Sequence, residues 1–241
     1  KVPRMSTQGI ELTFAVNHLS HFYLTQKILP LIDKNNDPKI IITSSEVHNP
    51  NSGGGKVGAK ASLGNLKGLE SGAGFEMLDG NKFNADKAYK DSKLCNILFA
   101  RKLSDNLMRN KLSIPVIAWA PGLVISRDKL GFFRYSRKYN QLGQILFAFL
   151  ARDVLRITTS NKNAGIILSN IACSSKYSKP AKRLIKFCSY ISEFPSDKII
   201  VHIFLTTSIL LFLSIAFIFF VNSWIWLASV SFFSASKIKL S

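Results

Sequence analysis

The chain has 241 residues, and its 32 lysines and arginines outnumber its 14 acidic residues, giving a formal charge of +18. Apolar residues make up 47% of the sequence, which excludes a disordered charged tail. Three widely spaced cysteines exclude a disulfide-stapled secreted domain and favour a reducing compartment. The lysines are scattered and accompany no nucleic-acid-binding motif. We therefore expect no nucleic-acid partner, and a basic surface that faces an anionic membrane or solvent.

The first half of the chain begins with a predicted helix and a predicted strand. Residues 11–33 form a helical pattern, in which Leu12, Val16 and other apolar residues share one face. The short β-branched run 39–43 is typical of a buried parallel strand. The glycine-rich segment 46–82 is longer than an ordinary connection, which indicates a functional or disordered loop.

The pattern of helix and strand then repeats. Residues 86–109 predict a second long helix, and 114–119 predict a second buried strand that ends at Pro121-Gly122. Residues 161–173 predict another helix, after which no final strand is recognisable. This alternation predicts parallel crossover connections, so the fold class is a doubly wound α/β sheet.

Three parts differ in composition along the chain. Residues 1–175 are expected to form the α/β domain, and 176–198 form a basic connector. Residues 199–236 contain no Asp, Glu, Lys or Arg. A helix of about 20 apolar residues spans a bilayer, so we predict a transmembrane helix here, with the basic connector on the cytoplasmic or stromal side. The alternatives are a buried pair of core helices or a segment translated out of frame.

Four polar residues are candidates for chemistry. Tyr89 and Lys93 lie four residues apart, one helical turn, and a neighbouring ammonium lowers the pKa of a phenol toward the working range. Ser45 follows the first strand at its carboxyl end, where open α/β sheets bind ligands, so its hydroxyl could hold a substrate carbonyl. Asn17 lies inside a predicted helix, where an amide is unfavourable. Each residue alone is also compatible with an ordinary solvated side chain, but their order along the chain is informative.

This order resembles that of the short-chain dehydrogenase/reductase superfamily. The resemblance is carried by Asn17 in NHLSHF, Ser45 in IIITSSEVH, Tyr89 and Lys93 in YKDSK, and Pro121-Gly122 in APGLVIS. It implies that Tyr89 is the general acid–base, and that Lys93 lowers its pKa and holds the nicotinamide ribose. It also implies that Ser45 orients the substrate and that Asn17 anchors a water and the lysine.

The same resemblance implies a cofactor, with NADPH favoured. Pro121, Gly122 and Ser126 would line its nicotinamide, beside Tyr89 and Lys93. The family's opening strand and glycine-rich turn, which bind the cofactor pyrophosphate, do not occur in this sequence. We expect roughly the first 80–100 residues of the family's layout to be missing before Lys1, so that the doubly wound fold is N-terminally truncated. The chain as given should then neither bind NADPH well nor turn over.

The segment from KASLGN to FARKL resembles one branch, the light-dependent protochlorophyllide oxidoreductases. The long insert between Ser45 and Tyr89 resembles that branch, and Cys95 also matches. The resemblance implies a small lipophilic substrate, protochlorophyllide or a related pigment, in chlorophyll biosynthesis at a plastid membrane. Leu123 stands where the branch has a cysteine after Pro-Gly. This departure fits a paralogue that reduces another carbonyl or alkene.

Two other functions remain open at this point. One is a retinol-dehydrogenase-like reductase that acts on a lipophilic carbonyl. The other is a non-catalytic, membrane-anchored remnant of such an enzyme.

Overall fold

The computed structural model describes residues 2–125, 141–155, 157–179 and 185–187. The chain divides into two units, Lys1–Tyr190 and Ile191–Ser241, and every described residue belongs to the first. The predicted membrane segment lies outside the described residues. Within the described ranges, no helix combines the length and the apolar character needed to cross a bilayer.

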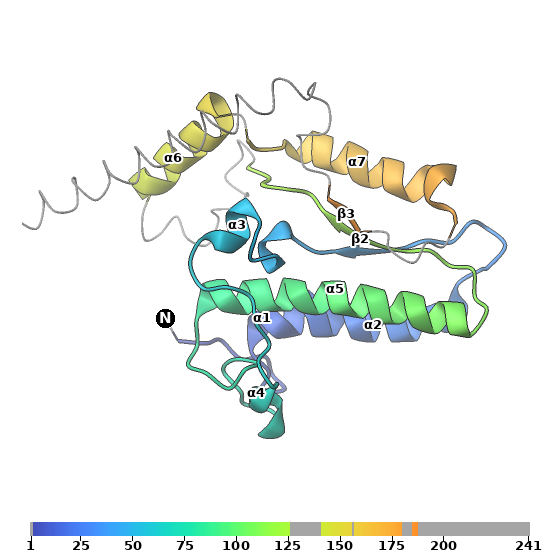
Figure 1. Ribbon diagram of the computed structural model, residues 1–241, viewed down its shortest axis with the longest axis horizontal. Coiled ribbons are helices and arrows are strands. Elements are labelled where there is room, and N and C mark those ends of the chain that lie inside the picture. The colour runs from blue at the N-terminus through green and yellow to red at the C-terminus, as the bar shows by residue number, and fades with distance from the viewer. Residues whose placement is uncertain (1, 126–140, 156, 180–184, 188–241) are drawn as a thin grey trace, which may run out of the picture. The chain divides into compact units, whose positions relative to one another are not determined.

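Three parallel strands form the sheet (Figure 1). Strand β1 (Ile40–Thr43) pairs with β2 (Val116–Ala120), which pairs in turn with β3 (Ile185–Phe187). All five residues of β2 are buried, as expected for an apolar run in the middle of a parallel sheet. Strand β3 corrects the expectation that no strand follows the helix over 161–173. A three-residue strand within a lysine-rich segment has too little apolar pattern to be recognised in the sequence.

The longest helix, α5 (Ala85–Arg109), connects β1 to β2 and packs on one face of the sheet. It begins where the side chain of Asn84 accepts a hydrogen bond from the backbone N–H of Lys87. Leu103 and Leu107 are almost fully buried in the core that α5 forms with β1 and β2. The helix predicted over 86–109 is thereby confirmed.

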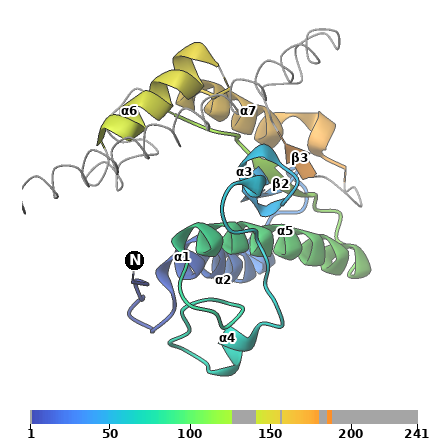
Figure 2. The ribbon, with the colours of Figure 1, turned by 60° about the vertical axis from the view of Figure 1, so that its left-hand side comes forward.

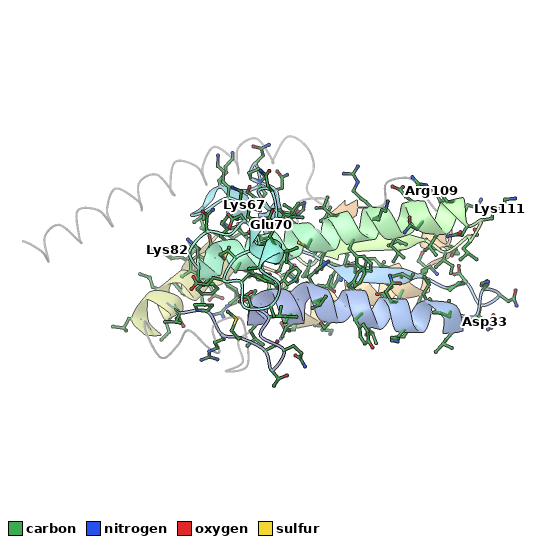
Figure 3. All side chains as sticks on the ribbon, turned by 90° about the horizontal axis from the view of Figure 1, so that it is seen from below. Asp33, Lys67, Glu70, Lys82, Arg109 and Lys111 are labelled. Carbon is green, nitrogen blue, oxygen red and sulfur yellow. The ribbon has the colours of Figure 1, made fainter. Side chains whose placement is uncertain are left out.

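A second helical run lies beside α5 on the same face (Figure 3). It consists of α1 (Leu12–Phe14), a π-helix (Ala15–Leu19) and α2 (Ser20–Ile28), followed by a short 3-10 turn. The carboxylate of Glu11 caps its start by accepting bonds from the N–H groups of Thr13 and Phe14. The run confirms the helix expected here, with a π-helical turn inside it that the pattern did not predict.

The opposite face of the sheet is covered by α7 (Asn161–Cys173), as Figure 2 shows. Ile171 packs with Ile117 and Trp119 of β2 in a separate core cluster. Helices therefore cover both faces of a parallel sheet, which confirms the α/β fold class.

Two regions carry helices that the sequence did not predict. The insert after β1 contains a 3-10 turn (Glu46–His48), α3 (Gly53–Lys56) and α4 (Lys67–Glu70). Residues Gln141–Phe149 form α6, which continues as a π-helix over Leu150–Val154.

Candidate active site at the carboxyl end of the sheet

The predicted strand-end residues meet at one edge of the sheet. The backbone N–H of Ser44 donates to the carbonyl of Trp119 over 2.8 Å, so β1 and β2 end side by side. Ser45 follows β1 and the Pro121-Gly122 turn follows β2. Gly122 has a φ of +76°, which a residue with a Cβ rarely adopts, so this turn requires glycine. The predicted Ser126 lies outside the described residues.

Tyr89 and Lys93 reach this edge from α5. The ammonium nitrogen of Lys93 lies 5.6 Å from the centre of the Tyr89 ring and donates to the carbonyl of Thr43 over 3.4 Å. The hydroxyl of Ser45 lies close enough to the phenol of Tyr89 to act on its pKa. Lys93 is only 7% exposed, whereas Tyr89 is 40% exposed. The structure therefore brings three of the four predicted catalytic residues together, with Tyr89 partly exposed.

Burial dominates the electrostatics of this pair. It raises the pKa of Tyr89, although the hydrogen bond from Ser45 acts in the opposite direction. Burial also lowers the pKa of Lys93. The sequence predicted that Lys93 would lower the pKa of the phenol. In the chain alone the pKa of Tyr89 is instead raised, because desolvation of the phenolate outweighs the stabilising effect of Ser45. At neutral pH the phenol keeps its proton, which is the form that can donate one.

Asn17 joins the site through a serine of the YKDSK motif. Its amide nitrogen donates to the hydroxyl of Ser92 over 3.1 Å, and that hydroxyl donates to the carbonyl of Tyr89 over 2.7 Å. Asn17 lies in the π-helix, a local widening that often occurs at functional sites. The structure thus gives Asn17 a contact with α5, the helix that carries Tyr89.

Asn96 is a residue that the sequence analysis missed. It is fully buried, and its amide nitrogen donates to the carbonyls of Asn17 and Thr43 over 2.9 and 3.0 Å. Its oxygen lies 2.9 Å from Nδ1 of His18, and burial lowers the pKa of that histidine. A neutral His18 with its proton on Nδ1 satisfies this contact. The sequence feature that could have identified Asn96 is its position as a polar residue within the apolar run around Cys95.

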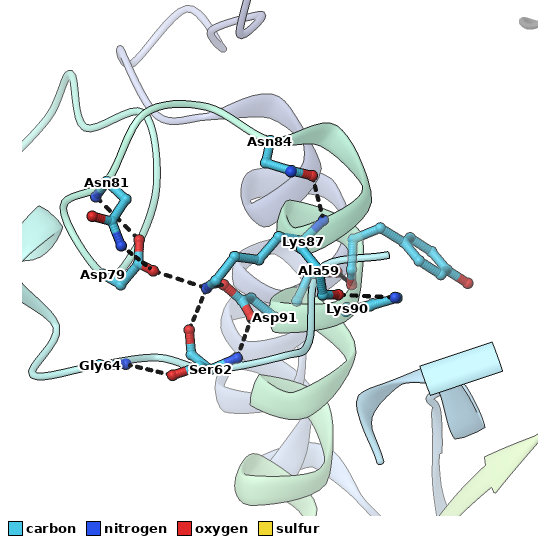
Figure 4. Close-up of polar contacts among 11 residues, drawn as sticks. Ala59, Ser62, Gly64, Asp79, Asn81, Asn84, Lys87, Lys90 and Asp91 are labelled. Atoms are coloured by element: carbon cyan, nitrogen blue, oxygen red, sulfur yellow. Dashed lines mark hydrogen bonds and ion pairs between the residues drawn. The ribbon is translucent and has the colours of Figure 1, made fainter. Parts of the chain in front are cut away.

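The long insert is fastened to α5 beside Tyr89 (Figure 4). The ammonium of Lys87 lies 2.5 Å from Asp91 and 3.0 Å from Asp79 of the insert. Asp91 also accepts the backbone N–H of Ser62 over 2.8 Å. Burial raises the pKa of Asp91, while its hydrogen bond with Lys87 acts in the opposite direction. Two charged residues of the helix thus hold two separate points of the insert.

Lys90, a buried cation of the YKDSK motif, holds the same insert. The ammonium of Lys90, 2% exposed, bonds to the carbonyl of Val57 and, over 2.9 Å, to that of Ala59. In Figure 3, Lys67 and Lys82 of the insert lie near one end of α5, and Arg109 lies at the other end. The insert, predicted to be functional or disordered, is therefore docked against the amino-terminal half of α5, which carries Tyr89.

Cys95 lies one turn after Asp91 on the same helix and is buried. Burial, with a smaller effect of the Asp91 charge, raises the pKa of its thiol to about 12. The structure gives this cysteine the properties of a small packed side chain rather than those of a reactive thiolate.

Comparisons with known proteins relate the chain to one group of enzymes. No family model matches it. The protochlorophyllide reductase of Chlamydomonas reinhardtii is 33% identical over 183 residues, which cover 74% of this chain and 44% of that enzyme. Protochlorophyllide reductase B of Hordeum vulgare is 29% identical over 82% of this chain and 51% of that enzyme. The Avena sativa protochlorophyllide reductase is 41% identical over 103 residues.

The chain spans about half or less of the length of these curated relatives. Among solved structures, an uncharacterized protein from Mycobacterium paratuberculosis aligns over 51% of this chain with a TM-score of 0.38 and 25% identity. That likeness is too weak to support an argument about the fold.

The parallel α/β sheet, with Ser45, Tyr89 and Lys93 at its carboxyl edge, is the arrangement expected of a short-chain dehydrogenase/reductase. The chain is a homologue of the protochlorophyllide reductases. The resemblance found in the sequence is thereby confirmed.

The buried amide of Asn96 generates a stability prediction. Replacing Asn96 by Leu leaves the carbonyls of Asn17 and Thr43 and the ring of His18 without this partner. We expect a loss of roughly 3 kcal/mol in the free energy of unfolding, since each buried unsatisfied group costs about 1–3 kcal/mol. Denaturant titration measures it. The control is Asn51→Leu at an exposed position, and equal stability of the two variants would contradict the prediction.

The thiol of Cys95 generates a reactivity prediction. With a pKa of about 12, it should react with iodoacetamide at pH 8 on the order of 10³ times more slowly than a free cysteine, because so little thiolate forms. The exposed Cys173 is the internal reference, and peptide mapping by mass spectrometry separates the two. Denaturation should equalise the rates. Similar labelling of both residues in the folded chain would show that Cys95 is accessible.

Proposed function

We propose that this chain carries the proton-donating site of an NADPH-dependent reductase of the protochlorophyllide reductase type. The reaction adds a hydride and a proton across a substrate double bond. The observation that carries the proposal is that Tyr89 and Lys93 meet at the carboxyl edge of the sheet beside Ser45, with the ammonium of Lys93 5.6 Å from the centre of the phenol ring. Open α/β sheets bind their ligands at this edge.

Tyr89 is the proton donor in this proposal. Its phenol is protonated at neutral pH, partly exposed, and held by Ser45. Once the proton has left, the ammonium of Lys93 and the hydroxyl of Ser45 stabilise the phenolate. Ser45 also orients the substrate, and Asn17 supports the arrangement through its bond to Ser92.

The residues present fit the nicotinamide end of the cofactor. Lys93 offers a buried ammonium for the ribose hydroxyls, and the Pro121-Gly122 turn lets the backbone approach a flat ring without a Cβ. Ser126 is proposed to complete this side. When bound, NADPH supplies the hydride.

The proposed substrate is a lipophilic pigment, protochlorophyllide or a close relative, in a plastid. The names of the relatives support this choice, since they are protochlorophyllide reductases and many are described as chloroplastic. Leu123 after the Pro-Gly turn favours a second candidate, a retinol-dehydrogenase-like reductase of another lipophilic carbonyl or alkene. Membrane association fits either substrate.

Replacing Tyr89 by Phe removes the proton donor. In the longest natural form of the protein, we expect turnover to fall at least ~10²-fold, the lower range for general acid catalysis. Tyr23→Phe is the matched control, because Tyr23 is 62% exposed on α2 and the same hydroxyl is removed. Stopped-flow measurement of NADPH oxidation gives the rate. Unchanged turnover in Tyr89→Phe would contradict the role of the phenol.

The substrate is tested separately by illuminating the same protein with protochlorophyllide and NADPH. Loss of pigment absorbance above the dark control supports the pigment assignment. Reduction of retinal-type carbonyls without loss of the pigment supports the second candidate. A protein that reduces neither substrate class would be a non-catalytic remnant, and the proposal would be wrong.

A further inference from the structure

The hydroxyl of Ser45 has two competing uses in the turn that follows β1. Ser45 is the N-cap residue of the 3-10 turn Glu46–His48. A serine at this position often caps the turn by accepting a backbone N–H with its hydroxyl. The side chain of Ser45 makes no such capping bond. Its hydroxyl is therefore left for Tyr89, and its direction is fixed by something other than capping.

The backbone before Ser45 is held by the buried residue Ser44. The N–H of Ser44 donates to the carbonyl of Trp119 over 2.8 Å, and its hydroxyl donates to the carbonyl of Lys93 over 3.0 Å. The chain that enters Ser45 is therefore fastened to β2 through one group and to α5 through the other.

The backbone after Ser45 is held by the ring of His48. Nδ1 of His48 lies 2.6 Å from the carbonyl oxygen of Ser45, and the backbone N–H of His48 donates to the same oxygen over a longer 3.4 Å. A carbonyl oxygen only accepts, so Nδ1 carries the hydrogen. Ser45 itself is extended, with φ −157° and ψ 147°. Because the peptide groups on both sides are fixed, the Cβ of Ser45 has one direction.

We propose that His48 is a positioning residue, which holds the hydroxyl of Ser45 beside the phenol of Tyr89 through its bond to the Ser45 carbonyl. The role rests on the proposed function of Tyr89, but the positioning itself operates in the chain without cofactor or substrate. When the ring is removed, the hydroxyl of Ser45 is free to turn back and cap the 3-10 turn.

The turn has other fastenings, so a variant of His48 should keep its fold. The N–H of Asn49 donates to the carbonyl of Glu46 over 2.9 Å. The hydroxyl of Ser52 contacts the carbonyls of Glu46 and Asn49 over 2.8 and 2.9 Å. These bonds do not involve the ring, and they remain when it is replaced.

The test measures the pKa of Tyr89 by NMR titration of the whole chain. The hydroxyl of Ser45 lowers this pKa, so a variant that misplaces the hydroxyl should raise it. We expect His48→Ala to produce about half or more of the rise seen in Ser45→Ala, and to add nothing in a chain that already carries Ser45→Ala. Val47→Ala is the matched control, since it shortens a side chain of the same turn and keeps the ring. It should leave the pKa of Tyr89 unchanged.

Two further variants separate positioning from general damage to the turn. The amide of asparagine places its N–H near the position of Nδ1 of histidine, whereas the amide of glutamine reaches the position of Nε2. His48→Asn should therefore restore the pKa of Tyr89, and His48→Gln should not. In the longest natural form of the protein, turnover should fall about threefold to tenfold in His48→Ala, as for the loss of one hydrogen bond, and recover in His48→Asn.

Three results would overturn the role of His48. They are an unchanged pKa of Tyr89 in His48→Ala, an equal rise with and without the hydroxyl of Ser45, and equal behaviour of the asparagine and glutamine variants. If Ser45→Ala itself leaves the pKa unchanged, the role of His48 is refuted together with the site. Unchanged turnover in Tyr89→Phe would refute the reductase alone, because the titration needs neither cofactor nor substrate.

Discussion

The buried polar face of α5 is the constraint on which the site depends. Between Lys90 and Asn96 the helix buries two ammonium groups, a carboxylate, a hydroxyl and an amide. Each of these groups would cost several kcal/mol if it lacked a partner in the interior. The partners come from three other places: the π-helix at Asn17, the end of β1 at Thr43, and the long insert. Providing hydrogen-bond partners for these buried groups of α5 therefore brings the π-helix, the end of β1 and the insert together around Tyr89.

The same constraint separates the roles of the two lysines in the motif. Lys90 points its ammonium into the carbonyls of the insert and is sealed from solvent, so its contribution is to hold the insert on the helix. Lys93 lies against the carbonyl of Thr43 and beside the ring of Tyr89, where its charge can act on a phenolate. Because burial raises the pKa of Tyr89, the phenol keeps its proton at neutral pH.

The sequence predicted helices and strands correctly where the hydrophobic pattern was continuous. It predicted α5, α7, β1 and β2, and it placed Ser45 and the Pro-Gly turn at the same edge. It did not reveal β3, because a short strand among lysines has no period to detect. It did not reveal that Lys90 and Asp91 are buried, because charged residues on a helix usually face water. The hydrogen bonds of Asn96 join α5 to the π-helix at Asn17 and to the end of β1 at Thr43. These three segments are far apart in the sequence, so no local sequence pattern predicts the bonds.

The central claim is that the phenol of Tyr89 lies beside the hydroxyl of Ser45 at the carboxyl edge of the sheet, and NMR titration of the ¹³C-labelled tyrosine ring tests it directly. Assignment by Tyr89→Phe identifies the signal. The account predicts a pKa above the ordinary value of 10.0, and a further rise in Ser45→Ala, because the hydroxyl that stabilises the phenolate is lost. A pKa at the ordinary value that does not respond to Ser45→Ala would place the ring in solvent and contradict the site.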